Sequence, residues 1–414
     1  MADTLKNSTA YDVDAVRRDF PILSEKVYGK PLVFLDSGAS AQKPRQVIDA
    51  MSACMQRQYS NVHRGAHYMS AATTDEHEKA RETVQKFLNA EHSEEIIFTA
   101  NVTMSINLVA HAYGRAFLKA GDEVIISEME HHANIVPWQM LAEATGVVLK
   151  IAPIEDDGSF LLEKFAALLT ERTKLVAITH CSNVLGTRVP AKELIRLAHD
   201  AGAKVLIDGA QGIVHGPVDV RDLDVDFYGF TAHKLYGPSG LGILYGKLDL
   251  LESMPPFLGG GEMIDKVSFA GTTFAKPPFR FEAGTPAIVE TIGLMAAIDY
   301  VTDIGHDAIK AHEQSLLDYA TERLSAVDGV RLIGTAPDKA AIVSFLVDGH
   351  HPLDIATILD RQGVACRVGH HCAEPLMDRL GVIGTVRASF AMYNTLAEVD
   401  VLAEAIEKAK RMLS

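Results

Sequence analysis

The chain has 414 residues, of which 48% are hydrophobic and 22% charged, and its 39 basic and 54 acidic residues give a net charge of −15. A single core stops growing at roughly 250–300 residues, so we expect two domains. The acidic balance excludes a chain-wide electrostatic surface for nucleic acid. The sequence contains no apolar run of membrane-spanning length and no apolar signal segment, so we expect neither feature. Its four scattered cysteines are unlike a secreted disulfide scaffold and predict a reducing, cytoplasmic compartment.

Helical and strand-like patterns alternate from about residue 73 to residue 250. Thr73 and Glu76 form a capping-box pattern, which predicts the start of a helix. The elements predicted next are a strand at 95–99, a helix at about 104–119 that stops at Gly121, and a strand at 123–127. Further along come a strand at 174–179, a helix at 191–201, and strands at 204–208, 225–230 and 241–245.

These strands are apolar on both faces and alternate with helices, which is typical of a mostly parallel sheet covered by helices. The strand at 241–245 follows its neighbour after a connection too short for a crossover helix, so we expect it to be antiparallel. The fold class predicted for this part is therefore α/β with a mixed, mostly parallel sheet.

A second unit begins where the pattern changes, after three consecutive glycines at 259–261 and the stiff Lys-Pro-Pro stretch at 276–278. Its predicted elements are helices near 287–304 and 306–326, strands at 341–347, 364–367 and 385–390, and a last helix capped by Thr395 and Glu398. We expect a large domain at 31–285 and a small α+β domain at 286–414. The segment 1–30 has no strand partner of its own and is expected to pack on the small domain.

Polar residues follow several predicted strands, and ligands of parallel α/β sheets bind at those carboxyl ends. Asp208 ends one strand and Lys234 follows another; separately, they are compatible with a helix cap and a salt bridge. Together they fit the two ends of pyridoxal phosphate, because lysine forms a Schiff base with the aldehyde and aspartate keeps the ring nitrogen protonated. Thr231 and His233, with the strand-to-helix turn at 101–103, would donate to the phosphate.

Cys372 lies in an Arg-Val-Gly-His-His-Cys-Ala stretch at 367–373. The sequence has no second cluster of cysteines or histidines that would complete a four-ligand zinc site with this stretch, so we expect no metal there. The alternatives are a buried, inert thiol and a reactive nucleophile on a loop, and the flanking histidines and arginines favour the thiolate and hence the nucleophile. Arg387 is either a surface residue or a clamp for a substrate carboxylate.

Two further stretches contain histidines. His131 follows the strand at 123–127, so it either covers a flat cofactor ring or is a structural, hydrogen-bonded histidine. The polar stretch at 61–67, which contains His63, either lines an entrance or is a solvated loop. Cys54 and Cys181 have apolar neighbours and are interpreted as packing residues.

From about residue 13 to its end, the chain resembles the group II, Suf-type cysteine desulfurases of the aminotransferase class V family, which have the fold type I architecture of pyridoxal phosphate enzymes. The motifs that carry the resemblance are His-Arg-Gly at 63–65, Glu-His-His-Ala-Asn-Ile-Val-Pro-Trp at 130–138, Ser-Asn-Val-Leu-Gly at 182–186, Asp-Gly-Ala-Gln at 208–211, Ala-His-Lys-Leu-Tyr-Gly-Pro at 232–238, Glu-Ala-Gly-Thr-Pro at 282–286 and the stretch at 367–373.

The resemblance implies a role for each matching residue. Lys234 would form the Schiff base, Cys372 would accept the sulfur, and His131 would stack on the ring and assist proton transfer. Asp208 would contact the ring nitrogen and Gln211 the ring hydroxyl. The phosphate would be held by Thr103, Thr231 and His233, and Thr285 would reach the phosphate of the partner in a homodimer. The substrate would be bound by Asn183, Arg387 and Arg367, with Asn183 also touching the cofactor. The sequence departs from the family at 101–103, where Asn-Val-Thr replaces the common Gly-Thr-Thr and removes one hydroxyl.

The implied activity converts L-cysteine to L-alanine, leaves a persulfide on Cys372 and passes the sulfur to a SufE- or SufU-type acceptor for iron–sulfur cluster assembly. Selenocysteine lyase shares these residues and remains an alternative. Aminotransferases, racemases and kynureninase-type enzymes of the same fold need the Lys234 and Asp208 pair but have no use for a nucleophilic cysteine. A non-catalytic scaffold would need neither Lys234 nor Cys372.

Overall fold

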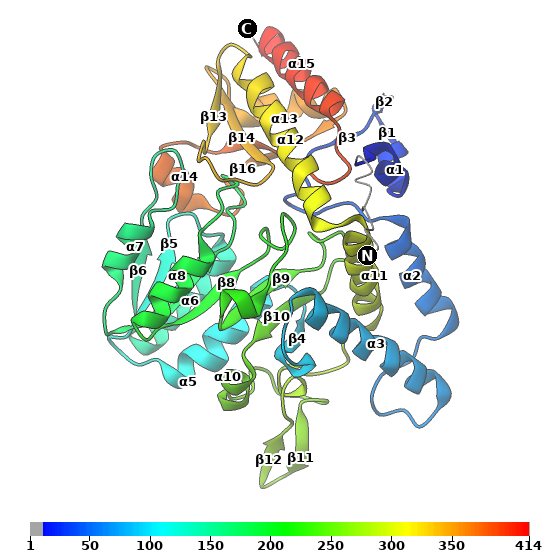
Figure 1. Ribbon diagram of the computed structural model, residues 1–414, viewed down its shortest axis with the longest axis vertical. Coiled ribbons are helices and arrows are strands. Elements are labelled where there is room, and N and C mark those ends of the chain that lie inside the picture. Colours follow the sequence, from blue (N-terminus) through cyan, green and yellow to red (C-terminus); the bar gives the residue numbers. More distant parts are fainter. Residues whose placement is uncertain (1–10, 414) are drawn as a thin grey trace, which may run out of the picture.

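The protein, described here for residues 11–413 by a computed structural model, is built on a seven-stranded sheet (Figure 1). The strands, in spatial order, are β4 (Ile96–Thr99), β10 (Gly242–Gly246), β9 (Phe227–Thr231), β8 (Lys204–Asp208), β7 (Thr173–Thr179), β5 (Glu123–Ser127) and β6 (Val148–Ala152). Only β10 among them runs antiparallel to its neighbours β4 and β9. The α/β fold and the antiparallel strand are thus confirmed.

Alternate residues of the central strands enter two separate hydrophobic cores. In β7, Val176 and Ile178 belong to one core, whereas Leu175 and Ala177 belong to the other. Because side chains alternate across a strand, this division shows that both faces of the sheet are covered. The covering and flanking helices are α2 (Arg45–Arg57), α3 (Tyr68–Phe87), α4 (Val102–Leu108), α5 (Arg115–Phe117), α6 (Val136–Thr145), α7 (Leu162–Leu168), α8 (Ala191–Asp200), α9 (Val220–Leu223), α10 (Leu248–Ser253) and α11 (Ile288–Ile304).

The second unit is a four-stranded antiparallel sheet with its own core, shown at the top of Figure 1. Its strands, in spatial order, are β13 (Val330–Ile333), β14 (Ile342–Val347), β17 (Thr385–Ser389) and β16 (Arg367–Gly369). Its helices are α12 (His306–Ser325), α13 (Pro352–Arg361), α14 (Glu374–Leu380) and α15 (Leu396–Leu413). The predicted cap of α15 is confirmed, because Glu398 accepts from the backbone of Thr395 and Thr395 accepts from that of Glu398.

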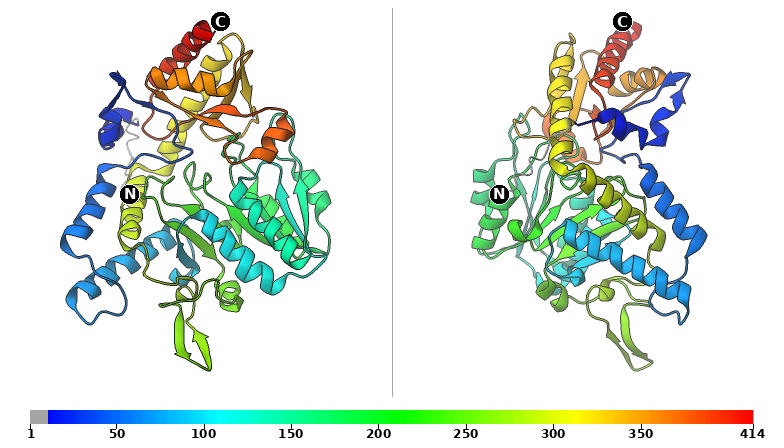
Figure 2. Two further views of the ribbon diagram at one scale, coloured as in Figure 1. Left: turned by 180° about the vertical axis from the view of Figure 1, so that it is seen from behind. Right: turned by 45° about the vertical axis from the view of Figure 1, so that its right-hand side comes forward.

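The N-terminal segment contacts the small unit, as both views of Figure 2 indicate. Its elements are α1 (Val13–Arg18), β1 (Lys26–Val27) and β2 (Lys30–Pro31), and β3 (Val33–Phe34) follows directly after it. Arg17 forms an ion pair with Glu398 of α15, and β3 pairs in parallel with β15 (Val364–Ala365). The expectation that this segment lacks a strand partner was wrong, since β1 and β2 pair with each other. Residues 1–10 of the segment lie outside the described residues.

These contacts support the three-part division at 1–30, 31–285 and 286–414, which we propose as the domain organisation. The small unit has a core of its own, and one of the two cores of the large sheet extends to Ile309 of α12 and to Leu376 and Met377 of α14. Helix α11 is the element that connects them, because it packs on α2 and α3 of the large domain and leads directly into α12 of the small one.

The structure differs from the sequence analysis in the start of one helix and in two further strands. Helix α3 begins at Tyr68 rather than at Thr73, and the His67 side chain caps it. Thr73 lies inside the helix, where its hydroxyl donates to the carbonyls of Gln58 and Met69. Strands β6 and β13 lie at sheet edges and were not predicted. Most of their residues are partly or fully exposed, so neither strand has the continuous apolar run that marks a buried strand in a sequence.

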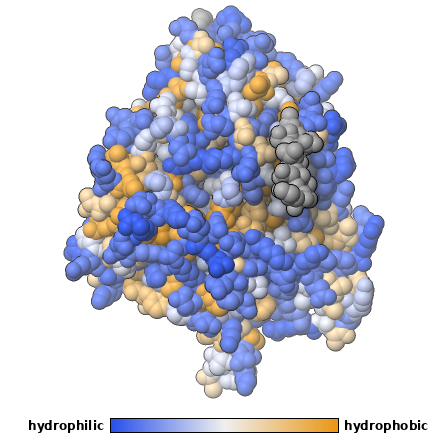
Figure 3. All heavy atoms as spheres, in the orientation of Figure 1, coloured by the Kyte–Doolittle hydropathy of each residue, from blue (hydrophilic) through white to orange (hydrophobic). Residues whose placement is uncertain are grey.

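A hairpin of β11 (Ile264–Ser268) and β12 (Gly271–Phe274) projects from the large domain at the bottom of Figure 1. Hydrophilic residues cover most of the face shown in Figure 3. None of the described helices combines the length and the apolarity needed to cross a membrane.

Position 242 of β10 requires a glycine because the backbone of Asn101 lies very close to it, not because of its own backbone angles. A Cβ atom at this position would lie 2.3 Å from the carbonyl carbon of Asn101, in the turn that precedes α4. We expect Gly242→Ala to lower the free energy of unfolding by about 1–3 kcal/mol, as overpacking does, in a urea titration. Gly259→Ala is the matched control, because a Cβ there meets nothing within 4 Å. Equal stability of the two variants would contradict the predicted clash.

Candidate active site

The carboxyl ends of the large sheet open into a cavity of about 400 Å³. Lys234 follows β9, Asn183 follows β7 and His131 follows β5 at this edge. The small unit contributes the other wall. The cavity is lined by Gly38, Ala39, Asn101, Val102, Thr103, His131, Asn183, Thr231, His233, Lys234, Arg367, His371, Cys372 and Arg387, and an adjoining recess of about 30 Å³ adds Asp208 and Gln211.

The amine of Lys234 has no hydrogen-bond or ion-pair partner among the described residues. Burial lowers the pKa of Lys234 to about 8, although the Asp208 carboxylate opposes this shift. An amine with this pKa has a substantial uncharged fraction near neutral pH and is mostly uncharged above pH 8, which makes it a competent nucleophile and base.

Asp208 is buried at the end of β8 and keeps one oxygen uncommitted. Its Oδ1 accepts from the backbone N–H of Ala210, at 3.0 Å, and within residues 11–413 nothing donates to its Oδ2. Burial raises the pKa of Asp208, while Ala210 and Lys234 favour its charged form. A cationic N–H placed at Oδ2 would satisfy both the hydrogen bond and the charge.

His131 has one tautomer defined by its surroundings. Its Nδ1 accepts from the backbone N–H of Ala133, at 3.0 Å, so the proton of the neutral ring lies on Nε2. Burial, and then Lys234, lowers the pKa of His131 to about 4, which keeps the ring neutral. Below it, buried Glu130 accepts from Asn134 and from the backbone of Thr179, and holds this loop against β7.

The predicted phosphate end lies at the start of α4, which Asn101 caps through Met104. Thr103 and His233 reach the cavity and make no side-chain hydrogen bond to the rest of the described chain, while the Thr231 hydroxyl donates to Leu241. Val102, where the family has a hydroxyl, packs towards Gly229 of the neighbouring strand. The missing hydroxyl is therefore replaced by a contact with the core.

Arg387 is buried, and its Nε has no hydrogen-bond partner in the described part of the chain. Its other nitrogens donate to the Asn183 carbonyl at 2.9 Å and to Asp36 at 3.3 Å. Arg367 also pairs with Asp36, at 2.9 Å. A buried guanidinium with free N–H donors is a site for an anion such as a carboxylate.

Cys372 lies in a turn between β16 and α14, and it is exposed, whereas Cys54 and Cys181 are buried and Cys366 is half-buried. The φ angles of His371 and Cys372 are 54° and 56°. Two consecutive left-handed residues other than glycine cost about 1–2 kcal/mol each, so neighbouring contacts must hold the turn.

Those contacts come from the large domain. The Asn183 side chain donates to the carbonyl of His371 at 2.8 Å, and the backbone N–H of His132 donates to that of Cys372 at 2.7 Å. The His132 ring accepts from the backbone of Glu374 at 3.1 Å. These bonds place the thiol at the rim of the cavity that contains Lys234.

Two residues at this site were missed by the sequence analysis. Asp36 pairs with both Arg367 and Arg387. The sequence contains a pattern that could have indicated this residue, because Asp36 ends an apolar run and precedes Ser-Gly, as Asp208 precedes Gly-Ala. His132 had no such signal, since its partner is a backbone N–H from a distant segment.

Gln211 and Thr285 differ in their distance from the cavity. Gln211 lies in the recess, where its side chain donates to the Gly38 carbonyl at 2.7 Å. Thr285 lines a different hollow and does not reach Lys234 of its own chain.

Comparison with known proteins places this geometry in a family. Residues 33–402 match the model of the aminotransferase class-V family. A cysteine desulfurase of Dickeya dadantii is 52% identical over 404 residues, which cover 97% of this chain and 98% of the relative. The chain belongs to the class-V aminotransferase family. A probable cysteine desulfurase of Mycobacterium leprae is 49% identical over 99% of this chain, which spans 67% of that relative.

A solved structure agrees with the fold. The cysteine desulfurase CsdA of Escherichia coli has a TM-score of 0.90 at 41% identity, covering 98% of this chain and all of that one. The predicted family, fold class and pyridoxal phosphate cofactor are thereby confirmed.

The cavity of this member of the class-V aminotransferase family fits the cofactor. Lys234 presents an unpaired amine to bind the aldehyde carbon, and Asp208 presents a free oxygen where a ring N–H would lie. Between them, His131 lines both the cavity and the recess. The cofactor's phosphate would be held by Thr103, Thr231 and His233.

Loading of the cofactor-free protein with pyridoxal phosphate tests the state of Lys234. Only the uncharged amine can attack the aldehyde, so we expect the rate to rise about tenfold per pH unit below pH 8 and to level off above it. The growth of visible absorbance after mixing, followed between about pH 6 and 9, measures this rate. A pH-independent rate would contradict a Lys234 pKa near 8.

Proposed function

We propose that the protein is a Suf-type cysteine desulfurase that converts L-cysteine to L-alanine. The observation that carries the proposal is that the exposed Cys372 thiol, the Lys234 amine and the Arg387 guanidinium share one cavity. Cys372 loses its thiol proton and attacks the substrate sulfur; the bond between that sulfur and the β-carbon breaks, and the carbon fragment gains protons to become L-alanine. The products are L-alanine and a persulfide on Cys372, so no external oxidant or reductant is needed.

Bound pyridoxal phosphate supplies the electron sink that allows this carbon–sulfur bond to break. Lys234 Nζ, with its pKa lowered to about 8, holds and returns the proton at the α-carbon. His131 is neutral, with its only N–H on Nε2, and assists proton transfer at the thiol side of the cavity. Asp208 Oδ2 keeps the ring nitrogen protonated.

The substrate carboxylate binds to Arg387, which lines the cavity and keeps N–H donors without a partner among the described residues. Asp36 holds the guanidinium in place from one side, and the Asn183 carbonyl holds it from another. Arg367, half-exposed and paired with Asp36, lies at the entrance and contributes positive charge. This arrangement orients the substrate with its sulfur towards the rim, where Cys372 lies.

The test is steady-state alanine release from L-cysteine and from L-selenocysteine by the holoenzyme. We expect L-cysteine to be converted, with one persulfide trapped on Cys372 per chain by an alkylating reagent and mass spectrometry. Release of alanine from L-selenocysteine alone would replace the proposal with the selenocysteine lyase alternative. No alanine from either substrate would reject both.

We infer that the sulfur leaves on an acceptor protein of the SufE or SufU type and is used in iron–sulfur cluster assembly. Cys372 is exposed, so a thiolate of another protein can attack the persulfide and regenerate the free Cys372 thiol. Alanine release with and without each acceptor measures this step. An acceptor of the right type accelerates turnover and itself acquires the persulfide, whereas unchanged turnover with both acceptors would contradict the inference.

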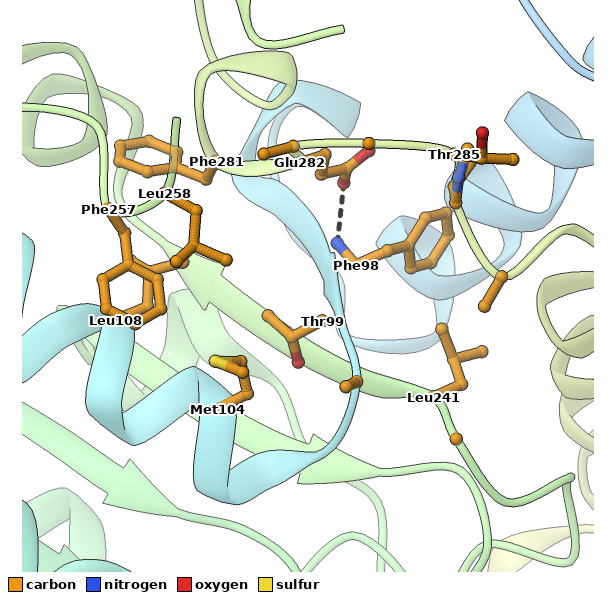
Figure 4. A pocket seen from close by; sticks show the side chains of 16 residues that line it. Phe98, Thr99, Met104, Leu108, Leu241, Phe257, Leu258, Phe281, Glu282 and Thr285 are labelled. Carbon is orange, nitrogen blue, oxygen red and sulfur yellow. Dashed lines mark hydrogen bonds between the residues drawn. The ribbon is translucent and has the colours of Figure 1, made fainter. Parts of the chain in front are cut away.

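We also propose that the protein is a homodimer in which Thr285 serves the phosphate of the partner subunit. Thr285 lies at an apolar hollow of about 270 Å³, seen in Figure 4 with Phe98, Leu241, Phe257 and Leu258. Apolar surface of this kind is covered in stable proteins, and a second copy would cover it while bringing Thr285 to the other cavity.

Mixed dimers test this arrangement. We expect a solution mass of twice the 44.9 kDa chain by light scattering, and reduced cofactor retention in Thr285→Ala. A dimer of one Thr285→Ala chain and one Lys234→Ala chain then contains one intact site, because Thr285 and Lys234 of that site come from different chains. Activity in the mixed dimer near half that of the wild type supports the proposal. A monomeric mass, or a mixed dimer as impaired as the Thr285→Ala dimer, overturns it.

A further inference from the structure

A cluster of two histidines and a glutamate lies outside the active-site cavity, where the loop before α3 meets that helix. His63 Nε2 lies 2.9 Å from Glu78 Oε1, and His77 Nε2 lies 4.0 Å from the same oxygen. One ligand atom from each of the three residues lies within 4.8 Å of the other two. The proposed reaction uses none of them.

The tautomer of His77 directs a lone pair into this cluster. The Thr291 hydroxyl donates to the Ile288 carbonyl at 2.9 Å, so towards His77 Nδ1, at 2.9 Å, it can only accept. Nδ1 therefore carries the proton and Nε2 is an acceptor. The His77 side chain is 0% exposed, and no group within residues 11–413 forms a hydrogen bond with its Nε2. A buried lone pair facing a carboxylate oxygen is unfavourable without a donor or a cation between them.

The surrounding charges leave the cluster negative. Arg81 is buried between Glu78, at 2.9 Å, and Glu282, at 2.7 Å, so one guanidinium balances two carboxylates. The nearby Arg64 is itself paired with Glu262, at 3.3 Å. One negative charge remains for a ligand to neutralise.

We propose that His63, His77 and Glu78 bind a divalent transition-metal ion, with zinc as the best match. Two imidazole nitrogens and one carboxylate oxygen are a common zinc donor set, and tetrahedral zinc places its ligand atoms roughly 3.3 Å apart. The separations of 2.9 and 4.0 Å bracket that value. Thr291 holds the far nitrogen of His77, as outer partners of metal-bound histidines do.

The site is open to solvent on one side. The side chains of His63 and Glu78 are 19% and 33% exposed, which gives the ion an entry path and leaves a fourth position for water. His63 loses its Nε2 proton on binding, and its unpartnered Nδ1 can carry it instead. The ion would fix the polar loop at 61–67 to α3, and through Thr291 to α11.

The experiment uses the holoenzyme, treated with a chelator and dialysed, and titrated with zinc chloride in a calorimeter. A Cys372→Ala background removes the exposed cysteine side chain, which would otherwise compete for zinc. We expect one zinc ion per chain, a higher melting temperature with zinc than without, and an X-ray absorption spectrum with nitrogen and oxygen but no sulfur neighbours.

Two substitutions in that background decide the assignment. His77→Gln and Glu78→Gln should each weaken zinc binding by at least about 100-fold and remove the rise in melting temperature. Glu78→Gln decides alone if His77→Gln does not fold. The control is His199→Gln, which changes a histidine that also contacts carboxylates, Asp224 and Asp226, and should leave binding unchanged. Absence of stoichiometric binding, or equal affinity in Glu78→Gln and its parent, overturns the proposal whether or not the enzyme makes alanine.

Discussion

Replacing Cys372 with alanine is expected to lower alanine formation from L-cysteine by on the order of 10³-fold or more. Cys372 is the exposed cysteine at the rim of the cavity, and without its sulfur nothing else in the described part of the cavity can attack the substrate sulfur. The measurement is steady-state alanine release by holoenzyme of matched cofactor content. Visible absorbance should persist, because Lys234 is unchanged.

Cys366→Ala is the matched control for this change. Cys366 lies six residues away and packs against the core of the small domain, and burial raises the pKa of its thiol, which disfavours the reactive thiolate. We expect its alanine formation to stay within about twofold of the wild type. Undiminished turnover in Cys372→Ala, or an equal loss in both variants, would refute the role proposed for Cys372.

Replacing Lys234 with alanine is expected to remove both the visible absorbance of the purified protein and its turnover, the latter by on the order of 10³-fold or more. The Lys234 amine is the group in the cavity that can bond to the aldehyde and then carry the α-proton. The absorbance spectrum and alanine release report these two losses separately. A Lys234→Ala protein that keeps the absorbance band of a lysine-bound cofactor would refute the assignment.

Lys339→Ala provides the comparison for Lys234→Ala. Burial lowers the pKa of Lys339 to about 8 as well, yet its amine donates to the Gly334 carbonyl in the small unit and does not line the cavity. This variant should lose some stability but keep its colour and turnover. A colourless Lys339→Ala protein would show that removing any buried lysine causes the loss of colour, and that the loss in Lys234→Ala does not depend on a bond between Lys234 and the cofactor.

Elements with a strong local pattern were predictable from the sequence. Strands β5 and β8 have the predicted bounds, 123–127 and 204–208, because each is a short apolar run buried on both faces. The start of α3 was not predictable in the same way. Thr73 has the local pattern of a cap, but its hydroxyl binds the carbonyl of Gln58, fifteen residues away, and that contact depends on how α2 approaches α3.

In the candidate site, too, some residues could be predicted from the sequence and others could not. Lys234, Asp208 and His131 all follow parallel strands, so one rule about strand ends brings them to the same cavity. The rule does not reach the partners that hold the site together. Asp36 meets Arg387 across 351 positions of sequence, and His132 meets the backbone of Glu374 across 242.

The sequence by itself therefore determined the order of the elements, the α/β class and the residue types that carry the chemistry, because each of these depends on neighbours within a few turns of chain. The tertiary structure alone decided which groups are paired and which are left free: the unpaired Nε of Arg387, the left-handed turn that presents Cys372, and the buried lone pair of His77. Whether a polar atom has a partner depends on distances between remote segments, and no local pattern contains those distances.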